Sequence, residues 1–74
     1  MLTLEPKAFL RDGLTYGENR RAFLFDVIGL REGQRIQIAE KRRRWQIRRA
    51  TDGGDYGGWS GRFGTAEEAL ASLG

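Results

Sequence analysis

Residues 35 to 48 read RIQIAEKRRRWQIR and contain two short alternations of apolar and polar side chains. The first covers Arg35–Ala39 and the second covers Arg44–Arg48, with Glu40–Arg43 between them. Strict alternation is typical of a strand with one buried face, and two such runs joined by a short polar segment indicate an antiparallel hairpin. This stretch therefore predicts a β-hairpin with one apolar face and one polar face.

A third strand and a helix are predicted after this hairpin. Asp52-Gly53-Gly54 supplies residues suited to a second turn, and Gly58–Phe63 follows as a glycine-rich strand. Thr65-Ala66-Glu67-Glu68 is a capping box, in which the Thr65 hydroxyl accepts from the Glu68 amide and the Glu68 carboxylate reaches back to the Thr65 amide. Apolar residues then recur at helical spacing, so the helix should run to near Gly74.

The segment before the hairpin carries signals for both a helix and a strand. Residues 15–18 form a second possible capping box, and Gly29 stands where a helix C-terminal glycine is common, so we interpret residues 16–28 as a helix. Alternation of Phe23, Phe25 and Val27 fits a strand nearly as well.

The predicted fold is a single small domain over residues 1–74, because the chain is too short for a second core. Residues 1–14 are left unassigned, since Pro6 suits the first turn of a helix while Leu2 and Leu4 alternate as in a strand. Residues 15–74 predict a two-layer α+β domain in the order α-β-β-β-α. In it a three-stranded antiparallel sheet packs against a C-terminal helix and an N-terminal helix.

The composition argues against most catalytic and metal chemistry. The chain has no His and no Cys, which removes Cys/His metal sites, cysteine nucleophiles, Ser-His triads and the usual neutral-pH proton shuttle. Glu67 and Glu68 would repel a phosphate from the start of the last helix, so the preceding glycines do not indicate a nucleotide site. We predict a non-enzymatic protein without metal or cofactor. Lacking an apolar run of membrane length or a signal-like N-terminus, it is expected in the cytoplasm, away from membranes.

Positive charge is concentrated in the middle of the chain. The net charge is only +3, yet residues 31–50 carry eight basic and two acidic residues, whereas residues 51–74 carry one and four. Residues 41–44 are four consecutive basic residues at the predicted hairpin tip, where they repel one another, so an anionic partner explains them more easily than folding does. Most basic residues are Arg, whose planar guanidinium suits phosphates, guanine edges and carboxylates.

Side-chain parity assigns a polar face to the predicted sheet. Period-two alternation puts Ile36, Ile38, Trp45, Ile47 and Phe63 on the covered face. Arg and Gln on the opposite face can read guanine and adenine in a major groove, although any half-exposed sheet also needs polar side chains to meet water. The residues predicted to bind a nucleic acid or another partner are Arg35, Gln37, Lys41, Arg42, Arg43, Arg44, Gln46, Arg48, Trp59 and Arg62.

Residues 59–69 read WSGRFGTAEEA and resemble the third strand and helix start of the ethylene-response-factor type DNA-binding domain. That family shows Trp-Leu-Gly-Thr-Phe-Asp-Thr-Ala-Glu-Glu-Ala there, and residues 45–48 look like its second strand. The similarity covers about the last thirty residues. The family lays a three-stranded sheet in the DNA major groove, and the resemblance implies binding roles for Arg44, Arg48 and Trp59. Parity places Trp59 on the covered face unless a bulge at Gly61 reverses it.

Two functions are consistent with these features. The leading prediction is a nucleic-acid-binding module, with DNA preferred over RNA, that uses the polar sheet face and the hairpin tip. The alternative is a small phage or mobile-element type adaptor or inhibitor that docks on a larger protein complex. In that case the arginines meet carboxylates, and Trp45 or Trp59 with Tyr56 supplies the buried anchor. In either case we expect a monomer or weak homodimer.

Overall fold

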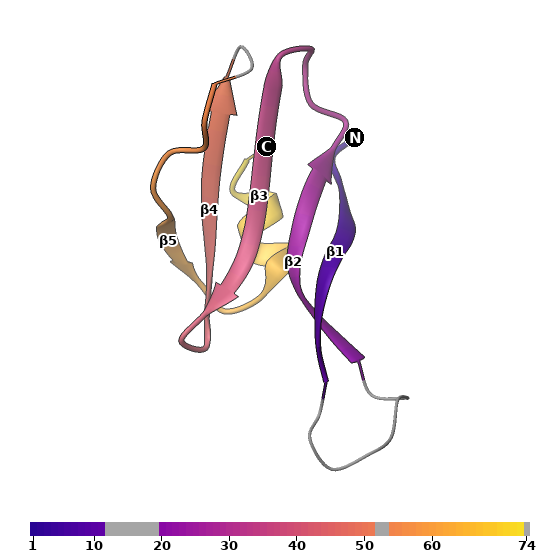
Figure 1. Ribbon diagram of the computed structural model, residues 1–74, viewed down its shortest axis with the longest axis vertical. Helices are drawn as coiled ribbons and strands as arrows, with labels where there is room; N and C mark the ends of the chain where they lie inside the picture. The colour runs from indigo at the N-terminus through magenta and orange to yellow at the C-terminus, as the bar shows by residue number, and fades with distance from the viewer. Residues whose placement is uncertain (12–19, 52–53, 74) are drawn as a thin grey trace.

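The computed structural model describes residues 1–11, 20–51 and 54–73, which form one antiparallel sheet and one short helix (Figure 1). The strands follow one another in space as they do in sequence, in the order β1-β2-β3-β4-β5. The elements are β1 (Thr3–Arg11), β2 (Arg20–Ile28), β3 (Gln34–Lys41), β4 (Arg44–Thr51), β5 (Ser60–Phe63) and α1 (Ala66–Ala71).

The predicted α-β-β-β-α fold is wrong, because the described part of the chain forms five strands and only a C-terminal helix. The expected helix over residues 16–28 is replaced by β2, and residues left unassigned near the N-terminus form β1. A helix would send Phe23 and Phe25, two residues apart, to nearly opposite sides, whereas a strand points both to one face. The capping box at residues 15–18 lies outside the described residues.

Two signals that suggested helix boundaries belong to the β1–β2 pair instead. Pro6 lies in β1, an edge strand of the sheet, beside a register shift between Pro6 and Ala8, and edge strands and bulges are where strands tolerate proline. Gly29 follows β2 with a φ of 99°, and a Cβ there would lie 2.5 Å from the Met1 carbonyl oxygen. The glycine therefore permits a close backbone approach at the end of a strand.

The predicted central hairpin is confirmed, but its connection is shorter than the predicted Glu40–Arg43 because Glu40 and Lys41 belong to β3. β3 and β4 pair in continuous antiparallel register from Gln34 opposite Thr51 to Lys41 opposite Arg44. Only Arg42 and Arg43 connect them, and both have positive φ angles, 51° and 66°. Positive φ at both central residues of a two-residue turn is the geometry of a type I′ turn, whose twist matches that of the flanking strands. The second turn predicted at Asp52-Gly53-Gly54 includes residues outside the described part.

Helix α1 packs on one face of the sheet, behind it in Figure 1, against β3, β4 and β5. Its capping is confirmed in one half: the Glu68 amide donates to the Thr65 hydroxyl at 3.1 Å, but the Glu68 carboxylate accepts from the Gly64 amide rather than from Thr65. The helix ends at Ala71, earlier than the predicted end near Gly74.

The core lies between this helix and the sheet, on the face that parity predicted to be covered. Phe25 packs against Trp45 with ring centroids 5.7 Å apart. The buried side chains of the cluster are Val27, Ile38, Trp45, Ile47, Ala66 and Ala69, with Ile36 and Phe63 among the partly buried residues packed against them. Among the residues that the structure describes, no helix is long and apolar enough to cross a membrane.

Candidate nucleic-acid interface

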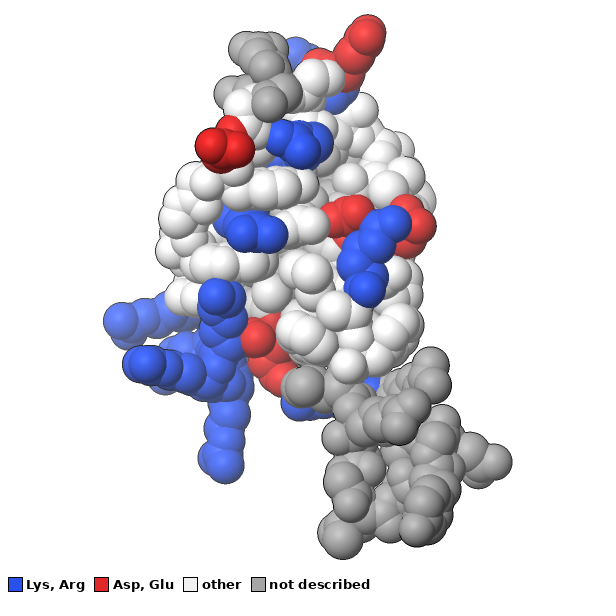
Figure 2. Space-filling view, viewed as in Figure 1, with Lys and Arg blue, Asp and Glu red and all other residues white. Residues whose placement is uncertain are grey.

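Basic side chains gather at one end of the face that α1 leaves uncovered. Figure 2 shows this face, with blue side chains projecting at its lower left, where β3 turns into β4 in Figure 1. The turn carries Lys41, Arg42, Arg43 and Arg44, all exposed, which we call the tip cluster. The two-residue turn is what brings these four consecutive residues to one point of the surface.

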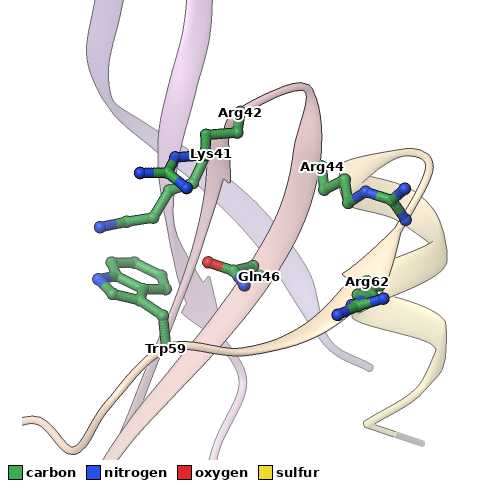
Figure 3. A pocket seen from close by; sticks show the side chains of 6 residues that line it. All are labelled: Lys41, Arg42, Arg44, Gln46, Trp59 and Arg62. Atoms are coloured by element: carbon green, nitrogen blue, oxygen red, sulfur yellow. The ribbon is translucent and has the colours of Figure 1, made fainter.

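A hollow of about 620 Å³ opens beside the tip cluster (Figure 3). The Lys41 ammonium lies over the Trp59 ring, 4.8 Å from its centroid. The Gln46 amide nitrogen donates to the Gly61 carbonyl at 3.4 Å, which ties the lining on β4 to β5. The lining residues are Lys41, Arg42, Arg44, Gln46, Trp59 and Arg62.

The cations around the hollow have no carboxylate partner within the described residues. The salt bridges of the described residues lie elsewhere: they join Lys7 to Glu5 and Asp26, and Arg21 to Glu40. Glu40, which immediately precedes the tip cluster, accepts from Arg21 at 2.9 Å and 2.6 Å through its two oxygens. The nearest acid in sequence is therefore held by β2, and the positive potential of the tip is not neutralised locally.

The turn itself is held in a conformation that its residues do not favour. Arg42 and Arg43 occupy the left-handed region, which costs a residue with a Cβ roughly 1 to 2 kcal/mol compared with its preferred conformation. Asn-Gly is the usual pair for such a turn. Two arginines in this position lower the stability of the fold and place two guanidinium groups at the tip. Strained backbone of this kind is concentrated at functional sites.

Besides Gln46, three of the predicted contact residues are bound to the protein itself. Gln37 donates to Asp26 at 2.8 Å and accepts from the Arg48 Nε at 2.8 Å. Arg35 donates to the Gly54 carbonyl and lies 5.0 Å from the Tyr56 ring centroid. Fewer side chains of the predicted polar face are thus available to a partner, because Arg35, Gln37 and Arg48 are used in contacts within the chain.

Arg48 also holds two aromatic rings on the uncovered face. Its guanidinium lies 4.4 Å from the Tyr56 ring centroid and 4.7 Å from that of Trp59. The Gly57 amide donates to the Arg49 carbonyl at 2.9 Å, so the segment before β5 runs along β4. Sequence reasoning considered Tyr56 only as a protein-binding anchor; an aromatic beside an Arg-rich strand was the available signal for its cation-π role.

A bulge at Gly61 determines where Trp59 lies. Trp45 is opposite Phe63, but two residues further on Ile47 is opposite Ser60, so β5 contains one extra residue. Gly61 has a φ of 95°, which suits a bulge. The alternative that parity left open is therefore resolved in favour of the uncovered face, where the Trp59 ring meets Lys41 and Arg48. Without a bulge, parity would place Ser60 on the polar face. In the structure it is instead opposite Ile47, a residue of the core.

The network on the uncovered face extends to β1. Asp26, which accepts from Gln37, also lies 3.7 Å from the Lys7 ammonium. The hydrogen bond with Glu5, followed by Coulombic attraction to that carboxylate, raises the pKa of Lys7 above its ordinary value. Lys7 is therefore a cation that is already paired, in contrast to those of the tip cluster.

No protein family, curated protein or solved structure matches this chain. The resemblance of residues 59–69 to the ethylene-response-factor type domain therefore stays a prediction. Within residues 1–11, 20–51 and 54–73, no three acidic side chains come together in a way that could hold a metal ion. The arrangement that stands out chemically is a hollow lined by cationic side chains and one aromatic ring.

Proposed function

We propose that this protein is a small non-enzymatic DNA-binding module whose contact surface is the tip cluster together with the hollow. The observation that carries the proposal is the set of five cations, Lys41 to Arg44 and Arg62, that salt bridges within the described residues leave uncompensated. Arginine side chains form bidentate hydrogen bonds with phosphate, and contacts to the phosphate backbone supply most of the affinity of such proteins for DNA.

Backbone contact accounts for this surface better than base reading by the sheet does. Gln37 and Arg48, which would have recognised adenine and guanine, already hydrogen-bond to each other, and Gln37 also donates to Asp26. Phosphate contacts position a protein on DNA without carrying sequence information. The proposed module therefore binds with little preference for base sequence.

A protein partner remains the alternative, but two of the three aromatic anchors predicted for it, Trp45 and Tyr56, are engaged within the chain. Trp45 is buried in the core, and the Arg35 and Arg48 guanidinium groups both lie against the Tyr56 ring. Binding energy at protein interfaces is concentrated in aromatic and Arg residues that fill a partner's pocket. A surface of cations without carboxylate partners, which retains one of these anchors, suits a polyanion better.

A charge-matched pair of double variants tests the proposal. Arg44→Gln with Arg62→Gln removes two positive charges at the hollow, whereas Arg31→Gln with Arg49→Gln removes two exposed ones away from it. Fluorescence anisotropy with labelled 20-nucleotide DNA, single-stranded and duplex, at about 50 mM salt should show wild-type binding at micromolar protein. The first pair should weaken it about tenfold or more, and the second should weaken it much less.

Two results would refute the proposal. Wild-type protein could fail to bind either form of DNA at tens of micromolar, in the range where even non-specific complexes form. Alternatively, both double variants could lose affinity equally, which would assign the effect to net charge and not to this surface. A second protein that this chain captures from a lysate, and that stays bound to it after nuclease treatment, would then favour the adaptor function.

A further inference from the structure

The lining of the hollow includes an aromatic ring, which phosphate binding alone does not require. Trp59 is half-buried and is the aromatic residue that lines the hollow, among cationic side chains and one amide. In a DNA duplex the faces of the bases are stacked on one another, and only the backbone and base edges are accessible. A single strand offers base faces, which stack on aromatic side chains while its phosphates follow a positive groove.

We propose that the DNA bound at this surface is single-stranded and that one of its bases stacks on the Trp59 indole. This inference rests on the proposed DNA-binding function and specifies the form of DNA that the same site takes. Arg42, Arg44 and Arg62, which also line the hollow, then contact the phosphates on either side of the stacked nucleotide. The volume of about 620 Å³ is in the usual range for a small-molecule site, so it is large enough for one nucleotide.

The Trp59 ring is held in place before any ligand arrives. The bulge at Gly61 turns it to the uncovered face, and Arg48 lies against it at 4.7 Å. Arg48 is itself fixed by Gln37, which is fixed by Asp26. A ring that is already ordered loses little conformational entropy when a base stacks on it.

Lys41 is the side chain that the proposed stacked base displaces. Its ammonium lies over the indole at 4.8 Å, a position that a stacking base takes over (Figure 3). The lysine side chain is a flexible stem with a compact charge. Displaced from the ring, the ammonium moves to a phosphate, so the site exchanges one cation-π contact for a stacked base and a charge pair.

The test compares three labelled ligands of one length with the full chain at about 50 mM salt. They are a 15-nucleotide oligo-dT, a 15-unit strand with the same phosphates but abasic sugars, and a 15-base-pair duplex. Oligo-dT should bind about 5- to 150-fold more tightly than the abasic strand, the factor expected for one stacked base. Trp59→Ala should reduce the oligo-dT affinity to the abasic level without changing the abasic affinity itself.

Two further variants control for folding and for loss of an aromatic elsewhere. Trp59→Phe keeps an aromatic plate and should retain part of the preference for oligo-dT even if Trp59→Ala is unstable. Phe9→Ala removes an exposed ring on β1, across the sheet from β5, and should leave the affinities for all three ligands unchanged.

The outcomes separate this inference from the proposed function. Equal affinity for oligo-dT and the abasic strand, tighter binding of the duplex, or an oligo-dT affinity that Trp59 variants do not alter would overturn base stacking. DNA binding at the tip cluster would still stand in each of these cases. No binding to any of the three ligands at tens of micromolar would overturn both.

Discussion

Trp45 and Arg48 lie on the same strand but point to opposite faces of the sheet. Trp45 is 9% exposed and packs on Phe25 and the other core residues, whereas Arg48 lies against Tyr56 and Trp59. Parity in the sequence predicted both directions correctly. It could not predict that Arg48 is anchored by Gln37, because this contact depends on the register between β3 and β4.

Replacing Trp45 by Ala should destabilise the protein severely. Truncating a buried Trp costs about 3 to 5 kcal/mol, comparable with the total stability of a domain of this size. We expect a largely unfolded protein by circular dichroism at 25 °C. A cooperative thermal transition close to that of the wild type would mean that the core is on the other face.

Arg48→Ala and Arg44→Ala should differ in their effect on stability. Arg48→Ala removes two cation-π contacts and a charged hydrogen bond that is partly shielded from water. Together these losses should lower the free energy of unfolding by about 1 to 3 kcal/mol. Arg44 is exposed, and its replacement should change the free energy of unfolding by about 0.5 kcal/mol or less. Urea titration of the two variants measures the difference. Equal midpoints would show that the Arg48 contacts do not contribute to folding.

Among the elements, the β3–β4 turn gives up stability through its two residues. Arg42→Asn with Arg43→Gly installs the pair that a type I′ turn prefers and removes two positive φ angles from arginines. The double variant should be more stable by about 1 kcal/mol, which raises the melting temperature by about 4 to 8 °C in a domain of this length. A lower melting temperature than the wild type would show that the arginines stabilise the turn through contacts.

The bulge in β5 has its own test. Gly61→Ala forces a Cβ into the left-handed region and within 2.6 Å of the Phe63 ring, so it should cost about 1 to 2 kcal/mol and reduce oligo-dT binding by shifting Trp59. Gly58→Ala is the matched control, because a Cβ there meets nothing within 4 Å. If both variants melt and bind alike, the bulge does not position Trp59.

Element prediction succeeded where the signal was local and failed where it was ambiguous. The hairpin at residues 35–48 and the Thr65 cap rest on patterns with one common structural meaning, and both form. The segment over residues 16–28 carried a helix-type capping signal together with strand alternation. The choice between them was settled by pairing with β1 and β3, which is a long-range interaction that no local pattern specifies.

For the whole molecule, charge and topology together produce the candidate surface. The excess of basic residues in the centre of the sequence becomes local in space only because β3 and β4 meet in a two-residue turn. Of the predicted contact residues, those around the tip cluster and hollow come together as expected. Arg35, Gln37 and Arg48 are instead held in contacts within the chain, with partners that include Gly54, Tyr56 and Asp26 from other parts of the sequence.

The salt dependence of DNA affinity, measured for the wild type and for Arg42→Asn with Arg43→Gly, tests whether the tip cluster contacts phosphates. If the tip cluster and Arg62 contact phosphates, the logarithm of the single-strand binding constant should fall against the logarithm of salt concentration with a slope of about −3 to −4. The variant, although more stable, should bind more weakly and show a slope shallower by about 1 to 1.5. Identical slopes in the two proteins, or a wild-type slope near zero, would contradict DNA binding through this tip.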